Sequence, residues 1–331
     1  PPPRRTQGST RLGPNGDAPH GEFRPGSVGS ASMNRSIALV AALLLTLSAA
    51  PVAAQTAPSS DLLGWLASVE LAKGQNRFLF SLRDSSGAFV AAPDVEVALD
   101  FYDLDAGAEE VLFSTDARFL WAIEGIRGLY ATDVEFPHAG RWGTVFHATF
   151  PDGTTKTTNG MPFDVWEETT TPAIGAPAPL IDTPTAEDVG GDLSRISSDP
   201  DPIDRFYELS ILDAIEDDKP AVISFLTPAF CQTATCGPTM EKVKEVAASH
   251  PTDVNFVHVE PYLMWEKDGY LQPMLSEEGW LQPAPWTERY GLPVEPYLIV
   301  IDAEGLVRAK FEGAITVEEL EDALWEATQP L

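Results

Sequence analysis

The sequence of 331 residues predicts two domains, an N-terminal all-β sandwich and a C-terminal α/β domain. From about residue 60 to 168, hydrophobic side chains alternate with polar ones at a period of two, which is typical of strands with one buried face. From about residue 205 to 331, short apolar runs alternate with segments that carry helix-capping signals. Between them, residues 169–204 are acidic, rich in proline and without periodicity, which predicts an extended linker.

Two segments precede these domains. Residues 33–54 have the features of a Sec-type signal peptide: Arg35 in a short basic region, an apolar run over residues 37–47, and the small residues Val52-Ala53-Ala54 before a cleavage site. The alternative is an uncleaved membrane anchor. Residues 1–32 precede the only plausible start methionine, so we interpret them as an upstream, non-native segment. We therefore expect an exported protein of the periplasm, the cell envelope or the extracellular space.

The chain is strongly acidic, with a formal net charge of −29 and a sequence pI near 4.3. Such a charge repels nucleic-acid phosphates and anionic lipid surfaces, so we expect neither as a partner. The hydrophobic content of 44% is ordinary for globular domains. The charge favours solubility and identifies no substrate.

Runs of alternating residues define the strands of the first domain. Turn clusters at Asp84-Ser-Ser-Gly87, His138-Ala-Gly140 and Pro151-Asp-Gly153 separate these runs at the spacing of hairpins. About 110 residues in six or seven strands suit an immunoglobulin-like sandwich. The inward-facing residues that we expect include Phe78, Phe80, Leu82, Val97, Leu99, Phe101, Tyr130, Val134, Phe136, Trp142, Phe146 and Phe150.

The stretches Gly128-Leu-Tyr130 and Ala139-Gly140-Arg141-Trp142 resemble the small extracytoplasmic sandwiches called YtkA-like or FixH-like. Some relatives of those sandwiches bind copper through His and Met. Here His138, His147 and Met161 are available, and they lack a ligand-like spacing. We therefore expect a structural or protein-contact domain, with a membrane-anchored or envelope protein as its candidate partner.

The second domain begins with a helix, a strand and a longer helix. Ser210 and Asp213 form a capping box for a short helix. Residues 221–226 are an apolar run of strand length. Pro238 stands at a first helical position, and the residues that follow place one apolar face on the helix: Met240, Val243, Val246 and Ala247.

The rest of this domain reads as three strands and a last helix. Residues 254–259 form the next strand, and Tyr297–Ile301 pairs with residues 306–311 in a hairpin. Thr316 and Glu319 form a second capping box, which starts the final helix. Strands and helices thus alternate through the domain, as in α/β folds.

The two cysteines of the chain, Cys231 and Cys236, lie between the strand at 221–226 and the helix that follows it. The positive end of a helix stabilises a thiolate, which is the reacting form of cysteine. Export into an oxidising compartment favours a disulfide between them. The position therefore predicts redox chemistry.

Three features give the second domain a resemblance to thioredoxin-like proteins of the bacterial cell envelope: Phe225-Leu-Thr before the cysteines, Glu295-Pro296 before a strand, and the terminal strand-turn-strand-helix. The resemblance implies a thioredoxin-like fold with thiol–disulfide exchange at Cys231 and Cys236. It also implies a cis proline at Pro296 as a third site residue, protein thiols and disulfides as partners, and no bound cofactor.

The sequence departs from that family in its cysteine spacing and its proton-transfer group. Four residues separate the cysteines instead of two. Aligning Cys236-Gly-Pro-Thr239 with the family motif makes Cys236 the expected nucleophile and Cys231 the resolving thiol, with the reverse assignment open. Ser224 occupies the position of a buried Asp, so His258 and Glu260 are the candidates for proton transfer; the alternative is an ordinary polar pair at a strand end.

Two other readings of the cysteine pair stay open. One is a structural disulfide in an inactive binding module. The other is metal handling by Cys231, Cys236 and His258, on a resemblance to copper chaperones of cytochrome oxidase assembly, since soft thiolates suit Cu(I). Residues 261–282 interrupt the domain with several aromatic and apolar side chains, which predicts either a lid or partner groove beside the site, or a satellite core.

Overall fold

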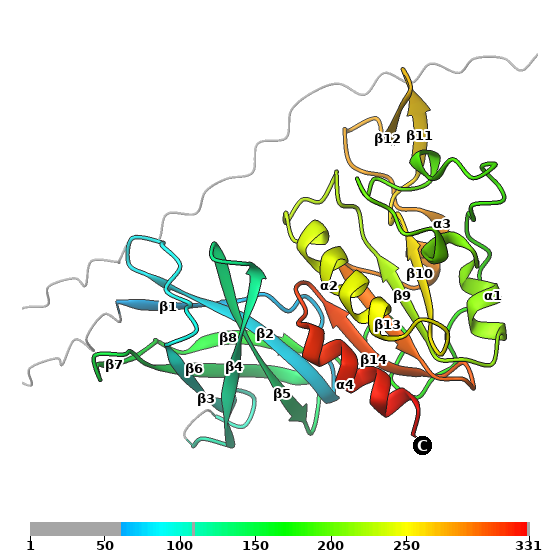
Figure 1. Cartoon of the computed structure of the whole chain (residues 1–331). Helices are drawn as coiled ribbons and strands as arrows, with labels where there is room; N and C mark the ends of the chain where they lie inside the picture. Colours follow the sequence, from blue (N-terminus) through cyan, green and yellow to red (C-terminus); the bar gives the residue numbers. More distant parts are fainter. Residues whose placement is uncertain (1–60, 108–109, 330–331) are drawn as a thin grey trace, which may run out of the picture. The chain divides into compact units, whose positions relative to one another are not determined.

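The computed structural model describes residues 61–107 and 110–329 (Figure 1). The segments at 1–32 and 33–54, which we interpret as upstream sequence and signal peptide, lie outside these residues. Among the described residues, no helix combines the length and the hydrophobicity that a membrane span requires.

The first part of the chain is one antiparallel sheet of eight strands, hydrogen-bonded in the order β1-β2-β5-β4-β3-β6-β7, with β8 paired to β6. Alternate side chains of these strands point inward and build an aromatic core that includes Phe78, Phe101, Tyr130 and Trp142, all completely buried. The strands are β1 Leu62–Leu66, β2 Gly74–Asp84, β3 Glu96–Asp103, β4 Phe113–Ile123, β5 Arg127–Phe136, β6 Gly140–Thr149, β7 Thr155–Thr157 and β8 Met161–Val165.

A second, four-stranded sheet has the order β10-β9-β13-β14. Its central strands β9 and β13 are buried at every residue, because helices cover both faces of the sheet. Helices α2 and α4 share one apolar cluster with the sheet and α1 shares another. The strands are β9 Ala221–Phe225, β10 Asn255–Val259, β13 Tyr297–Ile301 and β14 Val307–Glu312; the helices are α1 Ile211–Glu216, α2 Cys236–Ser249, α3 Pro285–Arg289 and α4 Val317–Ala327.

The fold class predicted from the sequence is wrong. The described residues are mostly β, with 38% in strands and 16% in helices, and fourteen strands lie in sheets beside four α-helices. The first sheet is continuous, whereas an immunoglobulin-like sandwich has two sheets. The rest of the chain is not an α/β thioredoxin-like domain.

The error has a physical cause. Capping signals show where a helix begins and leave its length open, and α1 and α3 have only 6 and 5 residues. Strand pairing is also not local: only β10 and β9 run parallel in the second sheet, while β13 and β14 pair antiparallel. The capping boxes themselves are confirmed at Ser210 with Asp213 and at Thr316 with Glu319.

The two segments without a predicted regular structure, 169–204 and 261–282, contain helical turns and strands. The segment 169–204 contains the 3₁₀ helix η1 (Leu193–Arg195), and near its start it hydrogen-bonds the beginning of β14: Val307 N–H donates to the Ala176 carbonyl at 2.9 Å. A further 3₁₀ helix, η2, follows at Asp204–Tyr207. Residues 261–282 form the hairpin of β11 (Met264–Lys267) and β12 (Tyr270–Pro273) with its flanking turns.

The first sheet is joined to the second part by polar contacts. The Arg77 guanidinium binds the Glu319 carboxylate at 2.8 Å and the Ala314 carbonyl at 2.8 Å, and both charged side chains are only 8% exposed. The Lys242 ammonium donates to the carbonyls of Trp121 and Ile315, each at 2.7 Å. All the described residues belong to one compact unit. The domain boundaries at 60–168, 169–204 and 205–331 stay predictions.

We expect Arg77→Ala to lower the free energy of unfolding by about 3 kcal/mol, because the buried Glu319 carboxylate loses its main charge partner. Arg118 also binds Glu319, but its side chain is 41% exposed, so Arg118→Ala should cost at most about 1 kcal/mol. Urea denaturation of the two variants at pH 7 measures the difference. Equal losses would contradict this account of the contact.

Candidate redox site

Cys231 lies on the loop from Leu226 to Thr235, between β9 and α2, and Cys236 is the first residue of α2. The loop turns back on itself at Ala234, which has a left-handed backbone with φ of 61°. The Ala234 N–H donates to the Cys231 carbonyl at 3.4 Å. This turn brings the Cys231 side chain to the beginning of the helix.

Cys231 accepts hydrogen bonds that stabilise its thiolate. The Cys236 N–H, which has no acceptor within the helix, donates to Cys231 Sγ at 3.2 Å, and the Thr233 hydroxyl lies 3.2 Å from the same sulfur. The hydrogen bond from the Cys236 thiol has the largest effect, and together with these donors it lowers the pKa of Cys231 to about 5, against the opposing effect of burial. Cys231 is half-buried, so reagents can reach it.

Cys236 has the opposite character. Its side chain is completely buried, and its hydrogen bond to Cys231 together with burial raises its pKa far above the usual range. We therefore reverse the roles expected from the sequence. Cys236 was expected to be the nucleophile because it is nearest the positive helix end. As the first helical residue, however, it turns its thiol into the core and donates its N–H to Cys231.

The Glu295-Pro296 peptide bond is cis, as predicted. The segment touches the cysteine loop through Glu295, whose carboxylate accepts from the Gln232 N–H at 3.2 Å and from the Tyr262 hydroxyl at 2.6 Å. Glu295 is 6% exposed, and its negative charge adds to the raised pKa of Cys236. The sequence assigns no role to Glu295 or Tyr262, because no local pattern shows that side chains so far from the loop along the chain would contact it.

His258 is a structural residue. It is 2% exposed, and its two ring nitrogens lie 2.8 Å from the Tyr207 hydroxyl and 2.9 Å from the Leu226 carbonyl. Burial lowers its pKa to about 4, so the ring is neutral near pH 7. With both nitrogens engaged, His258 is a poor candidate for proton transfer.

Glu260 is better placed for proton transfer. It is 3% exposed and accepts from the Ser198 N–H at 2.7 Å. Burial raises its pKa to about 7, an effect partly offset by the nearby Thr227 and by the hydrogen bond from Ser198. Thr227 affects the pKa of both Glu260 and Cys236 and so lies near both groups, but neither its hydroxyl nor Glu260 Oε2 has a hydrogen-bond partner among the described residues. Ser224, which replaces the expected carboxylate, is buried, and its hydroxyl has no hydrogen-bond partner among the described residues.

The metal-handling alternative gains no third ligand. Within the described part of the chain, no three side chains of His, Cys, Asp or Glu lie close enough together to hold a metal ion. In particular, His258 is turned to Tyr207 and Leu226 and does not complete a site with the two cysteines.

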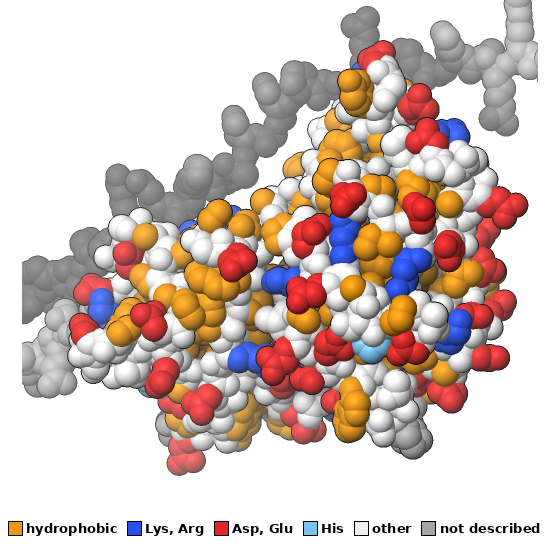
Figure 2. Space-filling model, in the orientation of Figure 1, with side chains coloured by type: hydrophobic (Ala, Val, Ile, Leu, Met, Phe, Trp, Pro, Cys, Tyr) orange, Lys and Arg blue, Asp and Glu red, His pale blue; other side chains and the backbone are white. Residues whose placement is uncertain are grey.

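A groove of about 450 Å³ runs beside the cysteine loop. Its lining includes Ala229 and Phe230, directly before Cys231, the segment around Pro200, and the tip of the β11–β12 hairpin at Tyr270. The region 261–282 exposes large side chains, with Tyr270 72% and Trp280 73% exposed. Figure 2 shows acidic side chains spread over the visible face and not gathered in one patch.

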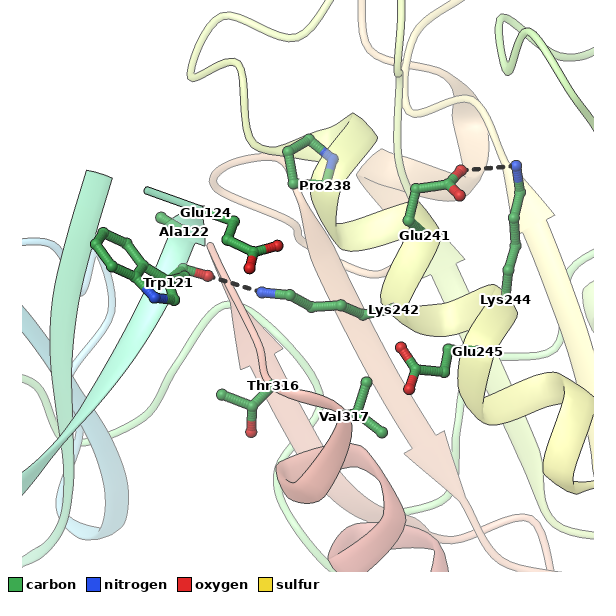
Figure 3. Close-up of a pocket in the computed structure, with 10 residues that line it drawn as sticks. All are labelled: Trp121, Ala122, Glu124, Pro238, Glu241, Lys242, Lys244, Glu245, Thr316 and Val317. Carbon is green, nitrogen blue, oxygen red and sulfur yellow. Dashed lines mark hydrogen bonds and ion pairs between the residues drawn. The ribbon is translucent and has the colours of Figure 1, made fainter. Parts of the chain in front are cut away.

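A larger hollow of about 720 Å³ lies between the end of β4 and the helices α2 and α4 (Figure 3). Trp121, Glu124, Pro238 and Lys242 are among its lining residues. Lys242 points across it to the Trp121 carbonyl. None of the site residues predicted from the sequence lines this hollow.

Comparison with known proteins gives little further information. No protein-family model matches the sequence, and no curated protein sequence matches it. Among solved structures, the Lin-41 filamin domain is similar to part of the chain, with 12% identity and a TM-score of 0.20. The match covers 33% of this chain and 96% of that domain. A likeness at this level defines neither a family nor a function.

Proposed function

We propose that the protein is a thiol–disulfide oxidoreductase in which Cys231 is the nucleophile and Cys236 the resolving thiol. The observation that carries the proposal is the Cys231 sulfur at the beginning of α2, where it accepts the Cys236 N–H at 3.2 Å and the Cys236 thiol lies beside it. A half-buried thiolate next to a second, protected thiol is the arrangement that such exchange requires.

In the reducing direction, the Cys231 thiolate attacks one sulfur of a substrate disulfide. A mixed disulfide forms, and the first substrate sulfur leaves as a thiolate that takes up a proton from water. Cys236 then loses its proton and attacks Cys231 Sγ, which breaks the mixed disulfide and releases the second substrate thiolate. The substrate disulfide gains two electrons, and the protein is left with a Cys231–Cys236 disulfide; the oxidising direction reverses these steps.

Glu260 is the group that we assign to the proton of Cys236. The thiol is buried and cannot pass its proton directly to water, whereas Glu260 lies near Thr227, as Cys236 does, and has a pKa raised to about 7 by burial. A carboxyl group with such a pKa exchanges protons efficiently near neutral pH. Glu260 is thus the proposed proton acceptor in the second step and the proton donor in the reverse direction.

Substrates of this site would be protein thiols and disulfides outside the cytoplasm, in keeping with the expected signal peptide. The groove beside Phe230 would take the polypeptide that flanks the substrate cysteine. Its walls of serine, proline and aromatic side chains suit backbone and apolar contacts. No bound cofactor is needed for this chemistry, because the two thiols supply both electrons.

Trapping of the mixed disulfide tests the proposal. We expect reduced Cys236→Ser protein mixed with insulin to accumulate a covalent complex, visible on a non-reducing gel and by mass spectrometry, because the resolving thiol is missing. Cys231→Ser should form no complex, and neither variant should reduce insulin catalytically. Absence of trapping, together with a reduction potential below about −300 mV for the wild-type pair, would instead identify a structural disulfide.

A further inference from the structure

A side chain of the first sheet reaches the cysteine loop. Arg127, the first residue of β5, donates from Nη1 to the Thr233 carbonyl at 2.9 Å. Thr233 stands between the two cysteines, and its hydroxyl lies 3.2 Å from Cys231 Sγ and 2.7 Å from the Thr235 hydroxyl. Arg127 is therefore separated from the reactive sulfur by a single residue.

The carbonyl that Arg127 binds belongs to the peptide group before Ala234. Ala234 has φ of 61°, a left-handed conformation that a residue with a Cβ rarely adopts. A hydrogen bond to the preceding carbonyl fixes the orientation of that peptide group and so favours this turn. This turn places the Cys231 sulfur beside the Cys236 N–H.

Arg127 is free to serve this role. Its guanidinium forms no ion pair with a carboxylate of the described residues, and it also lies over the ring of Phe89, at 5.9 Å from the ring centre. The neighbouring strand β4 is hydrogen-bonded to α2 near the end of the strand, where Lys242 of the helix donates to the Trp121 carbonyl (Figure 3). The β4–β5 hairpin is thus fixed both to the loop and to the helix that follows the loop.

We propose that Arg127 is a positioning residue that holds the Thr233–Ala234 peptide group, and with it Cys231, in the reactive arrangement at the beginning of α2. This inference rests on the proposed function. In this inference the first sheet contributes to the exchange reaction, because it supplies the Arg127 guanidinium that holds the cysteine loop in its conformation.

The test measures iodoacetamide alkylation of Cys231 against pH, and insulin reduction, in the full reduced chain. Arg127→Met removes the donors and keeps the length of the side chain. We expect it to raise the midpoint of the alkylation curve by about one pH unit, since a thiolate that loses ordered donors becomes more basic. Insulin reduction should fall about tenfold, and Arg127→Lys, which can still donate, should recover part of both losses.

Arg118→Met is the matched control, because Arg118 joins the same sheet to Glu319 without touching the cysteine loop. It should leave the midpoint and the activity unchanged. The inference is overturned if Arg127→Met leaves the midpoint unchanged, or if Arg118→Met shifts the midpoint as much as Arg127→Met does. A wild-type protein with no insulin reduction and no acidic alkylation midpoint would overturn the proposed function instead, so the two failures are distinct.

Discussion

At pH 7, iodoacetamide is expected to alkylate Cys231 of the reduced protein about a thousand times faster than Cys236, or more. The reason is that only the thiolate reacts, and the two thiols differ in both ionisation and access. Hydrogen bonds at the beginning of α2 lower the pKa of Cys231 to about 5, whereas Cys236 is buried and its pKa is raised. Quantitative peptide mapping by mass spectrometry at short reaction times measures the two rates.

The pH dependence of the Cys231 rate follows from the same pKa. Above pH 6 almost all of Cys231 is thiolate, so the rate should be nearly constant; below pH 5 it should fall about tenfold for each pH unit. A midpoint near 8.5, the value of a free cysteine, would contradict the role of the Cys236 N–H and the Thr233 hydroxyl. Urea-denatured protein is the control, and there both cysteines should titrate alike.

Glu260→Gln is expected to slow the second step of the exchange by about a hundredfold at pH 8, where the wild-type carboxylate is ionised and can accept the Cys236 proton. Burial raises the pKa of Glu260 to about 7. The wild-type rate of this step should therefore rise as pH increases through 7, and the rise should vanish in the variant. Rapid acid quenching, which follows decay of the mixed disulfide with insulin in a single turnover, measures the step.

Two controls isolate the effect of Glu260. Alkylation of Cys231 should be unchanged in Glu260→Gln, because the first step needs no proton from the carboxyl group. Glu241→Gln changes a carboxylate on α2 whose side chain is 72% exposed, and it should leave the second step as in the wild type. A Glu260→Gln protein that keeps the rise through pH 7 would assign the proton to another group.

Local patterns in the sequence were sufficient to predict many of the individual strands and helix starts. The run Tyr297–Ile301 is the strand β13 with the bounds predicted for it, and the capping box of Thr316 and Glu319 starts α4. These features depend on residues within a few positions of one another. The predicted fold class was wrong because a fold class depends on strand pairing and on helix length. Both are determined by contacts between residues that are distant in the sequence.

The site divides in the same way. The cysteine pair and its place between a strand and a helix follow from the sequence near those residues, whereas the cis bond before Pro296 was implied by the resemblance to thioredoxin-like proteins. Contacts from Tyr262 and Arg127 could not be predicted, since each comes from a distant segment that only the folded chain brings to the loop. The direction of the Cys236 side chain also depends on the packing around α2, which is why the two thiol roles were reversed.

The contact between residues 175–178 and the start of β14 has a consequence for the solution behaviour of the protein. Strand β14 is the last strand of its sheet, and such an edge offers unpaired N–H and carbonyl groups to other chains. Here Gly175 and Ala176 occupy these groups at Val307, so the connecting segment blocks intermolecular β-pairing at the first residue of this edge. The segment therefore opposes association of the chain at this end of β14, in addition to connecting the two sheets.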